Sequence, residues 1–505
     1  MSGDEPAHHS KEIELKFEVD PQDAARVAAH PLLRDSLVPP EERDLASFYF
    51  DTSDYALRKA RVYLRVRDTG TGYLQTIKSM RSEAEPMQRL EWERQITSPR
   101  PELDHAEGTA LAPLLTPEVR ASLQRLFETV VKRKTFLVAS RDSEIEVAID
   151  LGRVVSGERR QPISEIELEL KRGETKDLFC LARAFAQALP LRLAVKTKAE
   201  RGYELVEGHP HDVEKAGDID IKPDITTADA FCAIAHSCLR QVIVNEPAMS
   251  RGQAEALHQM RIGLRRLRAA ISIFDDVVAD EEQEKIKAGL KWITKELGPA
   301  RDLDVFAADV LKPQRDARPG DETLAAAHRE VEKKRAVAYA SAASAGRSPR
   351  FRNLVIDLVE WIEAGPWSVD DDEVRKELRK RPIAELAEKG LRRLRKRVKK
   401  KGAGLRHQSV HERHKLRIRA KRLRYATEFF AGTLTGAKRR AGALSALKDL
   451  QDALGELNDM ATRHTLIGHG VEHGPASSEE QAAKLLHNAE DAFSRFVDTK
   501  AFWKA

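Results

Sequence analysis

The N-terminal part of the chain alternates apolar with ionised residues, which is the period of β-strands that bury one face. The first such segment is Lys11–Val19. One of its faces would hold only apolar side chains, and the other would hold Glu12, Glu14, Lys16 and Glu18. Comparable segments follow at residues 60–67, 73–79, 88–96, 131–138, 144–150 and 164–171. We therefore expect an antiparallel sheet with one strongly charged face.

The charged faces of these strands carry groups of both signs, sorted by strand. Basic groups fall at Arg65, Arg67, Lys78, Arg89, Lys132 and Lys134, and acidic groups at Glu165, Glu167 and Glu169. The run Lys132-Arg133-Lys134 leaves the register of its strand open by one residue, so Arg133 is an alternative to its neighbours. A closed or curled sheet would gather these charges around a polar interior. Crowded carboxylates there would need a divalent cation, and the facing cations would need a polyanion.

The C-terminal part follows the period of α-helices, and one helical pattern occurs twice, at His258–Phe274 and His414–Phe430. One side of the first copy would hold Met260, Leu264, Leu267, Ile271 and Phe274. The opposite side would hold cations, which are His258, Arg261, Arg265 and Arg268 in the first copy and His414, Arg417, Lys421 and Arg424 in the second. A further echo relates residues 289–306 to 446–463, which indicates two related helical halves.

A row of four cations along one helix stores repulsion that a bound anion would relieve. A single row of this kind is usually a solvated face, but a matched second copy favours an anion-binding role. Residues 392–401 are also strongly basic, as either a solvated helix end or the rim of such a surface. The cationic faces carry few aromatic residues, so base stacking is poorly supplied and nucleic acid is disfavoured as the anion. RNA is kept as a less favoured alternative, because basic side chains would contact its phosphate backbone in the same way as another polyanion.

The net charge of +5 is unevenly divided, because residues 1–208 carry −4 and the remainder +9. The C-terminal part is therefore the one expected to attract anions. The three cysteines, Cys180, Cys232 and Cys238, show neither metal nor disulfide spacing, which is typical of a reducing compartment. The N-terminus is polar, and no apolar run approaches the ~18 residues of a membrane span. We therefore expect a cytoplasmic protein without a membrane partner.

The Glu12-x-Glu14-x-Lys16 pattern, followed in order by the charged strands, resembles the signature of the CYTH, or triphosphate tunnel metalloenzyme, family over roughly residues 10–206. Lys198-Ala-Glu-Arg201 also fits the late Ser-Lys motif of that family, with Thr197 in place of the serine. The resemblance implies an eight-stranded antiparallel β-barrel whose tunnel binds a triphosphate tail. It implies hydrolysis of inorganic triphosphate or related linear triphosphates, with Mg²⁺ or Mn²⁺ polarising the phosphoryl group.

The same resemblance implies roles for individual residues. The expected metal ligands are Glu12, Glu14, Glu165, Glu167 and Glu169. The expected phosphate contacts are Lys16, Arg65, Arg67, Lys78, Arg89, Lys132, Lys134 and Lys198. Glu14 and Lys16 are the expected catalytic residues, with Lys16 as a general acid or a stabiliser of the leaving group.

The two basic helices, together with the Leu297-Gly-x-x-Arg301-Asp302 segment, resemble the CHAD domain over roughly residues 220–500. That resemblance implies two helical bundles related by a pseudo-twofold axis, with a basic surface that binds inorganic polyphosphate. It would also place the protein on polyphosphate granules. The main alternative is a non-catalytic polyphosphate-binding scaffold, and an RNA-binding helical protein is less favoured.

The expected fold is therefore α+β, with an eight-stranded barrel followed by an all-α pair of bundles. We expect a disordered tail at residues 1–10, a barrel domain at 11–206 and a linker at 207–221. The helical domain would span residues 222–505, with halves at about 222–365 and 366–505. The oligomeric state is left open.

Overall fold

The structure is a computed structural model that describes residues 14–79, 90–208, 213–219, 221–434, 436–466 and 475–503. The chain forms two compact units, each made of non-consecutive segments. The first unit consists of residues 1–216, 236–264 and 280–366, and the second of residues 217–235, 265–279 and 367–505. The domain boundaries expected from the sequence stay predictions.

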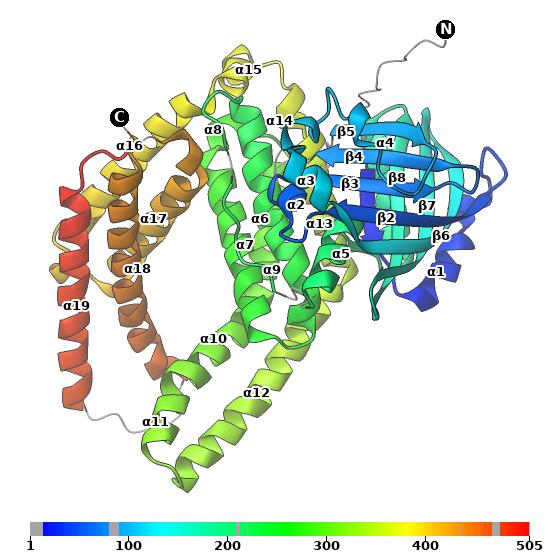
Figure 1. Cartoon of the computed structure of the whole chain (residues 1–505). Coiled ribbons are helices and arrows are strands. Elements are labelled where there is room, and N and C mark those ends of the chain that lie inside the picture. The colour runs from blue at the N-terminus through cyan, green and yellow to red at the C-terminus, as the bar shows by residue number, and fades with distance from the viewer. Residues whose placement is uncertain are drawn as a thin grey trace. The chain divides into compact units, whose positions relative to one another are not determined.

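The N-terminal part of the first unit is built on one antiparallel sheet of nine strands, which is strongly curved (Figure 1). In the order of hydrogen-bonded neighbours the strands are β5 (Leu90–Ile96), β4 (Tyr73–Ser79), β3 (Val62–Asp68), β2 (Glu41–Asp51), β6 (Gln124–Ser140), β7 (Ser143–Ser156), β8 (Arg159–Arg172), β1 (Glu14–Glu18) and β9 (Arg192–Leu193). Short helices α1 (Pro21–Ala28), α2 (Ala56–Lys59) and α3 (Pro117–Ser122) lie between them in the chain.

The predicted closed barrel of eight strands is corrected by this topology. Among the described residues the edge strands β5 and β9 do not pair with each other, so the sheet is open. The last strand, β9, is only two residues long and pairs with β1 through Phe17 and Glu18. The chain then leaves the sheet for the helix α5 (Lys198–Glu207), which packs on β6, β7 and β8. A helix, and not a further strand, therefore follows β9.

The two faces of the sheet differ as the alternation predicted. On β1, Leu15 and Phe17 are buried, and on β8 the same is true of Ile166 and Leu168. This apolar face is covered by α4 (Thr175–Ala188), which contacts β8 and buries four large side chains. They are Leu178, Phe179, Leu181 and Phe185. The opposite face carries the ionised side chains and is called the charged face below.

Helix α5 covers one end of the charged face. Its Ala199 and Tyr203 join a buried cluster with Tyr49 of β2 and Phe127 of β6. The approach is close, because a Cβ atom added to Gly202 would lie 1.9 Å from the Phe127 ring. Only glycine fits at that position without moving the helix or the ring. At the end that α5 covers, the charged face therefore carries apolar side chains. Beyond α5 it carries the ionised ones.

The remaining described elements are mostly helices. They are α6 (Thr227–Ser250), α7 (Ala254–Ile273), α8 (Asp275–Val278), α9 (Gln283–Glu296), α10 (Gly298–Phe306), a π-helical turn (Ala307–Leu311), α11 (Lys312–Ala317), α12 (Glu322–Arg347), α13 (Pro349–Ala364), α14 (Pro366–Val369), α15 (Glu373–Lys380), α16 (Ile383–Gly402), α17 (Val410–Phe429), α18 (Ala437–Leu466) and α19 (Pro475–Asp498). No helix in the described ranges is both long and apolar enough to cross a lipid bilayer.

The two basic helices of the sequence are α7 and α17, and the predicted apolar side of the first is buried. Its members are Met260, Leu264, Leu267, Ile271 and Phe274, all at most 1% exposed. In the second unit, the two copies of the pattern contact each other. The rings of Phe274 and Phe430 lie 5.9 Å apart, and Arg422 donates to the backbone carbonyl of Ser272. The expected pair of bundles with pseudo-twofold symmetry stays a prediction.

Candidate functional site

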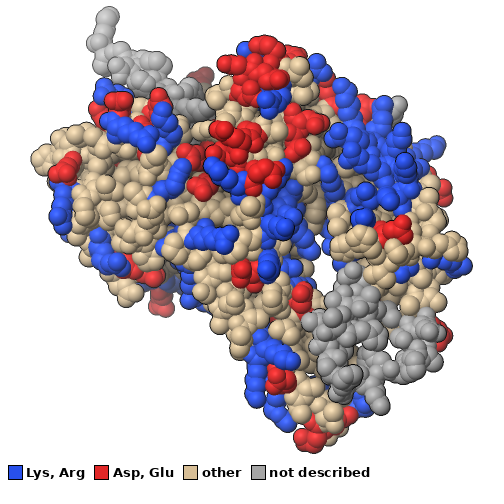
Figure 2. Space-filling model, turned by 180° about the vertical axis from the view of Figure 1, so that it is seen from behind, with Lys and Arg blue, Asp and Glu red and all other residues tan. Residues whose placement is uncertain are grey.

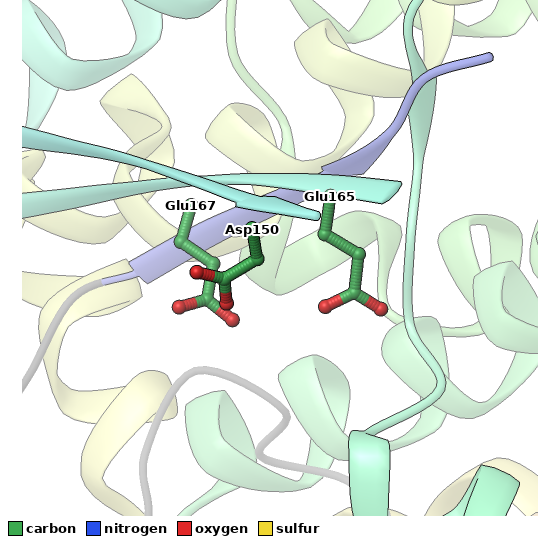
Figure 3. A group of neighbouring side chains, drawn as sticks. All are labelled: Asp150, Glu165 and Glu167. Atoms are coloured by element: carbon green, nitrogen blue, oxygen red, sulfur yellow. The ribbon is translucent and has the colours of Figure 1, made fainter. Parts of the chain in front are cut away.

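Three carboxylates meet on the charged face of the sheet (Figure 3). Asp150 on β7 is paired in register with Glu165 on β8, and Glu167 lies two residues further along β8. One oxygen from each residue lies within 4.8 Å of the other two. Asp150 is 1% exposed and Glu165 is fully buried, so these charges are removed from bulk water. We call Asp150, Glu165 and Glu167 the carboxylate group.

The ammonium of Lys198 contacts every member of the carboxylate group. Its Nζ lies 2.8 Å from Asp150 Oδ2, 2.9 Å from Glu165 Oε2 and 2.8 Å from Glu167 Oε1. Lys198 is the first residue of α5, so the start of that helix fixes where the ammonium reaches the sheet. The start is fixed by a capping box between Thr197 and Glu200, in which each side chain accepts a hydrogen bond from the other residue's backbone N–H.

Three further cations surround the same carboxylates. Lys16 Nζ lies 3.0 Å from Glu167 Oε1. Arg133 donates to both oxygens of Asp150 at 2.7 Å and also to Glu167. Arg201 of α5 lies 3.2 Å from Glu165 Oε1. Cations and carboxylates thus offset each other in a site where an unpaired buried charge would be costly.

The pKa values of these groups follow from the pairing. Burial opposes the charged form of Glu167, but Lys16 and the other cations outweigh it and hold its pKa well below the ordinary value. Burial likewise opposes the charge of Asp150, whose pKa is lowered by Lys198 and Arg133. Burial disfavours the charge of Lys198 as well, yet the carboxylates raise its pKa well above the ordinary value. Glu167, Asp150 and Lys198 are therefore ionised at neutral pH.

A second charged group lies on β3, β4 and β5 of the same face. Lys78 Nζ donates to Glu91 at 2.7 Å, and Arg65 lies 3.6 Å from both Glu91 and Glu93. Arg67 donates to the hydroxyl of Ser47 at 3.3 Å. The guanidinium of Arg65 is the largest influence on Arg67, and with burial and Arg133 it lowers the pKa of Arg67 to about 10. Crowded arginines on β3 and β6 form a surface that an anion would stabilise.

The predicted metal ligands only partly coincide with the carboxylate group. Glu165 and Glu167 belong to it, whereas Glu12 lies outside the described residues, as does the predicted phosphate contact Arg89. Glu14 and Glu169 are paired in register further along the charged face, where Glu14 lies 3.7 Å from Lys16 and Glu169 accepts from Lys171 at 2.7 Å.

Asp150 was not predicted as a ligand. The alternation of residues 144–150 placed it on a charged face, but only the register with β8 brings it beside Glu165.

The predicted face of the Lys132–Lys134 segment is corrected. Lys132 and Lys134 both pair with Glu42, at 3.1 and 3.0 Å, whereas the charged face receives Arg133. The register of β6 explains this. Arg133 is paired with Asp150 of the neighbouring strand β7, so the two residues beside Arg133 must point to the other side of the sheet. Arg133 therefore replaces Lys132 and Lys134 among the candidate phosphate contacts.

The donor set of the carboxylate group fits a hard divalent cation. Its three members offer only oxygen atoms, which is the donor type that Mg²⁺ and Mn²⁺ prefer. The same oxygens already hold the ammonium of Lys198, so the group is organised around positive charge. Asp150, Glu165 and Glu167 are thus the residues that could hold a metal ion.

The predicted polyphosphate contacts fall into both compact units. His258 and Arg261 belong to the first, where Arg261 donates to the carbonyl of Thr294 at 3.1 Å. The others belong to the second, and they are Arg265, Arg268, His414, Arg417, Lys421 and Arg424. Within the second unit Arg424 lies 3.6 Å from Glu428, so part of its charge is already offset internally.

Helices α16 and α17 of the second unit pack together and crowd their cations. Burial, followed by Arg397 and Arg393 of α16, lowers the pKa of Arg422 of α17. Figure 2 shows Lys and Arg side chains gathered on one face of this region. Exposed members on α16 are Arg392, Arg393, Lys396, Arg397 and Lys400. We call these residues, with Lys421, Arg422 and Arg424 of α17, the basic surface.

Comparison with known proteins places two families on the chain. The model of the CYTH domain matches residues 10–203, and that of the CHAD domain matches residues 233–468. An inorganic triphosphatase of Haemophilus influenzae is 32% identical over 197 residues, which are 39% of this chain and 55% of that protein. The chain thus spans about half the length of that relative.

Two solved structures are also similar. The CHAD domain from the plant Ricinus communis shares 27% identity with a TM-score of 0.48, over 58% of this chain and 99% of that one. A putative adenylyl cyclase from Hippeastrum, described as having a dominant triphosphatase activity, shares 16% identity with a TM-score of 0.30. That match covers 39% of this chain and 97% of the other.

Proposed function

Because the chain belongs to the proteins that carry a CYTH domain followed by a CHAD domain, we propose that its sheet hydrolyses inorganic triphosphate or a related linear triphosphate with a divalent metal ion. The carrying observation is the charged face itself. It holds a buried carboxylate group beside Lys16 and Arg133, and a second set of cations on β3 and β4. Acidic groups for a metal and basic groups for phosphates thus share one surface.

The residues divide the chemistry between them. A divalent ion held by the carboxylate group would polarise the phosphoryl group and offset its charge. Arg65, Arg67 and Lys78 would hold the phosphate oxygens farther along the face. Lys16, whose ammonium lies 3.0 Å from Glu167 Oε1, would donate to an oxygen of the leaving phosphate. Glu14, two residues before Lys16 on β1, is the candidate to orient the attacking water.

Phosphate release from a panel of substrates tests the proposal. Inorganic triphosphate, nucleoside triphosphates and longer polyphosphates would be compared with Mg²⁺, with Mn²⁺ and with EDTA. We expect release from a triphosphate that depends on the metal and stops with EDTA. Absence of release from every triphosphate would leave the non-catalytic scaffold, in which the sheet binds without hydrolysis.

Two substitutions locate the activity on the carboxylate group. Glu167→Gln removes one charged oxygen donor and should lower kcat by about 100-fold or more, since such groups act on the transition state. Glu144→Gln is the matched control on β7, where Glu144 pairs with Arg172 at 3.1 Å outside the group. Equal effects of the two substitutions would contradict the assignment.

A second pair of substitutions separates chemistry from binding. We expect Glu14→Gln to lower kcat and Lys78→Ala mainly to raise KM.

The crowded cations of α16 and α17 support a second function, the binding of inorganic polyphosphate by the helical region. A double charge reversal, Arg265→Glu with Lys421→Glu, should abolish polyphosphate binding and leave hydrolysis of triphosphate intact. The control is Arg495→Glu on α19, where Arg495 pairs with Asp449 at 2.8 Å. Fluorescence anisotropy with labelled polyphosphate gives the affinity, and competition with RNA separates the two anions. Unchanged affinity for long chains in the double variant would exclude the matched cations of α7 and α17 as the binding site.

A further inference from the structure

Arg240 of α6 has more hydrogen-bond partners than an arginine in a simple surface ion pair. Its guanidinium donates to the backbone carbonyl of Val195 at 3.1 Å and to Glu200 Oε1 at 2.8 Å. The guanidinium also donates to both carboxylate oxygens of Glu214, at 2.8 and 3.1 Å. The side chain is only 19% exposed. All four residues belong to the first compact unit, so one guanidinium joins α6 to two other segments of it, residues 195–200 and Glu214.

Glu200, one of these partners, also fixes the start of α5. While Oε1 accepts from Arg240, Oε2 accepts from the backbone N–H of Thr197 at 2.7 Å. The hydroxyl of Thr197 accepts in return from the backbone N–H of Glu200 at 3.0 Å. Arg240 therefore holds the carboxylate that closes the capping box, and through Val195 it holds the chain that enters the helix.

Lys198 lies between these held points. It follows the capping residue Thr197, and its ammonium must reach all three members of the carboxylate group. Because the ammonium meets three partners at once, only a narrow range of backbone positions at residue 198 lets a staggered lysine side chain reach all of them. A small movement of residues 195–200 would move the ammonium by a comparable distance. Such displacements cost reacting groups large factors in rate.

We propose that Arg240 is a positioning residue for the charged face, which acts by holding residues 195–200 so that Lys198 meets the carboxylate group. The activity readout rests on the function proposed above. Arg240 lies in the segment matched by the CHAD model, whereas Lys198 lies in the segment matched by the CYTH model. The helical region thereby contributes a structural part to a site on the sheet.

A double-mutant cycle tests this dependence in the full chain. Arg240→Met, Lys198→Met and the combined variant would be compared with the wild type for kcat and KM. We expect Arg240→Met to lower kcat on the order of 10-fold with little change in KM, and to have less than about a 2-fold effect once Lys198 is gone. An equal loss in both backgrounds would overturn the proposal, since Arg240 would then act independently of Lys198.

Two variants control for general destabilisation. Arg183→Met removes another partly buried arginine of the same unit, which pairs with Glu360 of α13. It should leave kcat unchanged. Glu200→Gln keeps an acceptor for the capping box but loses the charge that Arg240 holds, so it should lower kcat in the same direction by a smaller factor. If Arg240→Met does not fold, Glu200→Gln carries the comparison, and an unchanged kcat in it would contradict the proposal.

Hydrogen exchange supplies a readout that does not depend on catalysis. Backbone amides of residues 195–203 should exchange at least about 10-fold faster in Arg240→Met than in the wild type or Arg183→Met. Unchanged exchange would overturn the proposal, whatever the activity. Faster exchange in a protein that hydrolyses no triphosphate would refute the proposed function and leave the holding role of Arg240 intact. The two ideas therefore fail in different measurements.

Discussion

The ammonium of Lys198 and a divalent cation would use the same oxygens of the carboxylate group. Lys198 now contacts each of them at 2.8–2.9 Å. Because carboxylates that lie so close together repel one another, a cation among them favours their charged forms. The lysine therefore favours the ionised forms of Asp150 and Glu167. Arg133 adds to this effect, since its fork donates to both oxygens of Asp150.

The lowered pKa values of Glu167 and Asp150 predict how stability depends on acid. Their ordinary values are about 4.3 and 3.9, so their contribution is complete at neutral pH and is lost as the pH falls below about 4. Lys198 has a raised pKa, so its contribution is present below about 10.4 and is lost only at higher pH. We expect the melting temperature to be flat between about pH 5 and 9 and to fall in acid.

The fall of the melting temperature in acid should be smaller in Glu167→Gln, because the glutamine side chain takes up no proton in this pH range. Thermal melts from pH 3 to 9 in EDTA give the comparison, with Glu144→Gln as the control. An equally large fall in Glu167→Gln would show that other carboxylates control acid unfolding.

Arg67 carries the opposite kind of electrostatic signal. A cation whose pKa is lowered to about 10 is less stable in its charged form in the folded protein than in water. At neutral pH the repulsion from Arg65 is therefore present, and a bound anion would relieve it. We expect triphosphate in EDTA to raise the melting temperature of the wild type by several degrees, and of Arg67→Leu by clearly less. Without anion, Arg67→Leu should melt no lower than the wild type.

The control for Arg67→Leu is Arg94→Leu on β5. Arg94 alternates with Glu93, which faces Arg65, and so points to the opposite side of the sheet. Arg94→Leu should retain the full stabilisation by triphosphate. Equal loss in the two variants would indicate that triphosphate does not bind on the charged face.

At the scale of whole elements, the alternation of residues predicted which side chains share a face of a strand. It did not predict which strands lie next to each other. Glu165 and Glu167 could be assigned to a charged face from β8 alone. The partner of a strand is decided by packing and turns along the whole sheet, so neither Asp150 nor Arg133 could be chosen in advance. The duplicated helix pattern was easier to read, because burial of its apolar side follows directly from the helical period.

Closure of the sheet could not be predicted for a different reason. The last strand, β9, has only two residues, and helix α5 covers the end of the charged face instead. Short strands leave little alternation to detect. The contact of Gly202 with Phe127 joins segments far apart in the sequence, and no local pattern marks it.

The close packing of α5 leads to a prediction for Gly202→Ala. The added methyl group would overlap the ring of Phe127, so α5 must shift and the protein should lose about 1–3 kcal/mol of stability. Activity should fall with it, because Lys198 begins this helix. Gly390→Ala in α16 is the matched control, since nothing lies within 4 Å of the new Cβ, and it should stabilise by about 0.5–1 kcal/mol. Denaturant unfolding measures both, and a destabilised Gly390→Ala would undermine the comparison.

At the scale of the whole molecule, charge is divided between the two parts of the chain. Residues 1–208 carry −4, although their charged face holds arginines and lysines, and the remainder carries +9. Long anions should therefore be attracted first to the helical part, where the basic surface lies. The sheet would act on short triphosphates through a few buried contacts, which salt screens far less than exposed ones.

This division predicts different salt dependences for the two activities. Polyphosphate binding should weaken steeply between 50 and 200 mM salt, by about 10-fold or more, because each neutralised phosphate releases a counterion. The KM for triphosphate should change by a smaller factor over the same range. Anisotropy titrations and steady-state kinetics at matched salt concentrations test this. A steeper change in KM than in polyphosphate affinity would argue against two separate anion sites.

The grip of Arg240 on Val195, Glu200 and Glu214 also matters to anyone who engineers this protein. The two family matches end and begin at residues 203 and 233, which invites a cut in between to express or swap the two modules. Such a cut would carry α6 away from the first turn of α5. A graft that keeps residues up to the end of α6 with the sheet, and joins the new module after Ser250, would preserve the contacts of Arg240 with the start of α5.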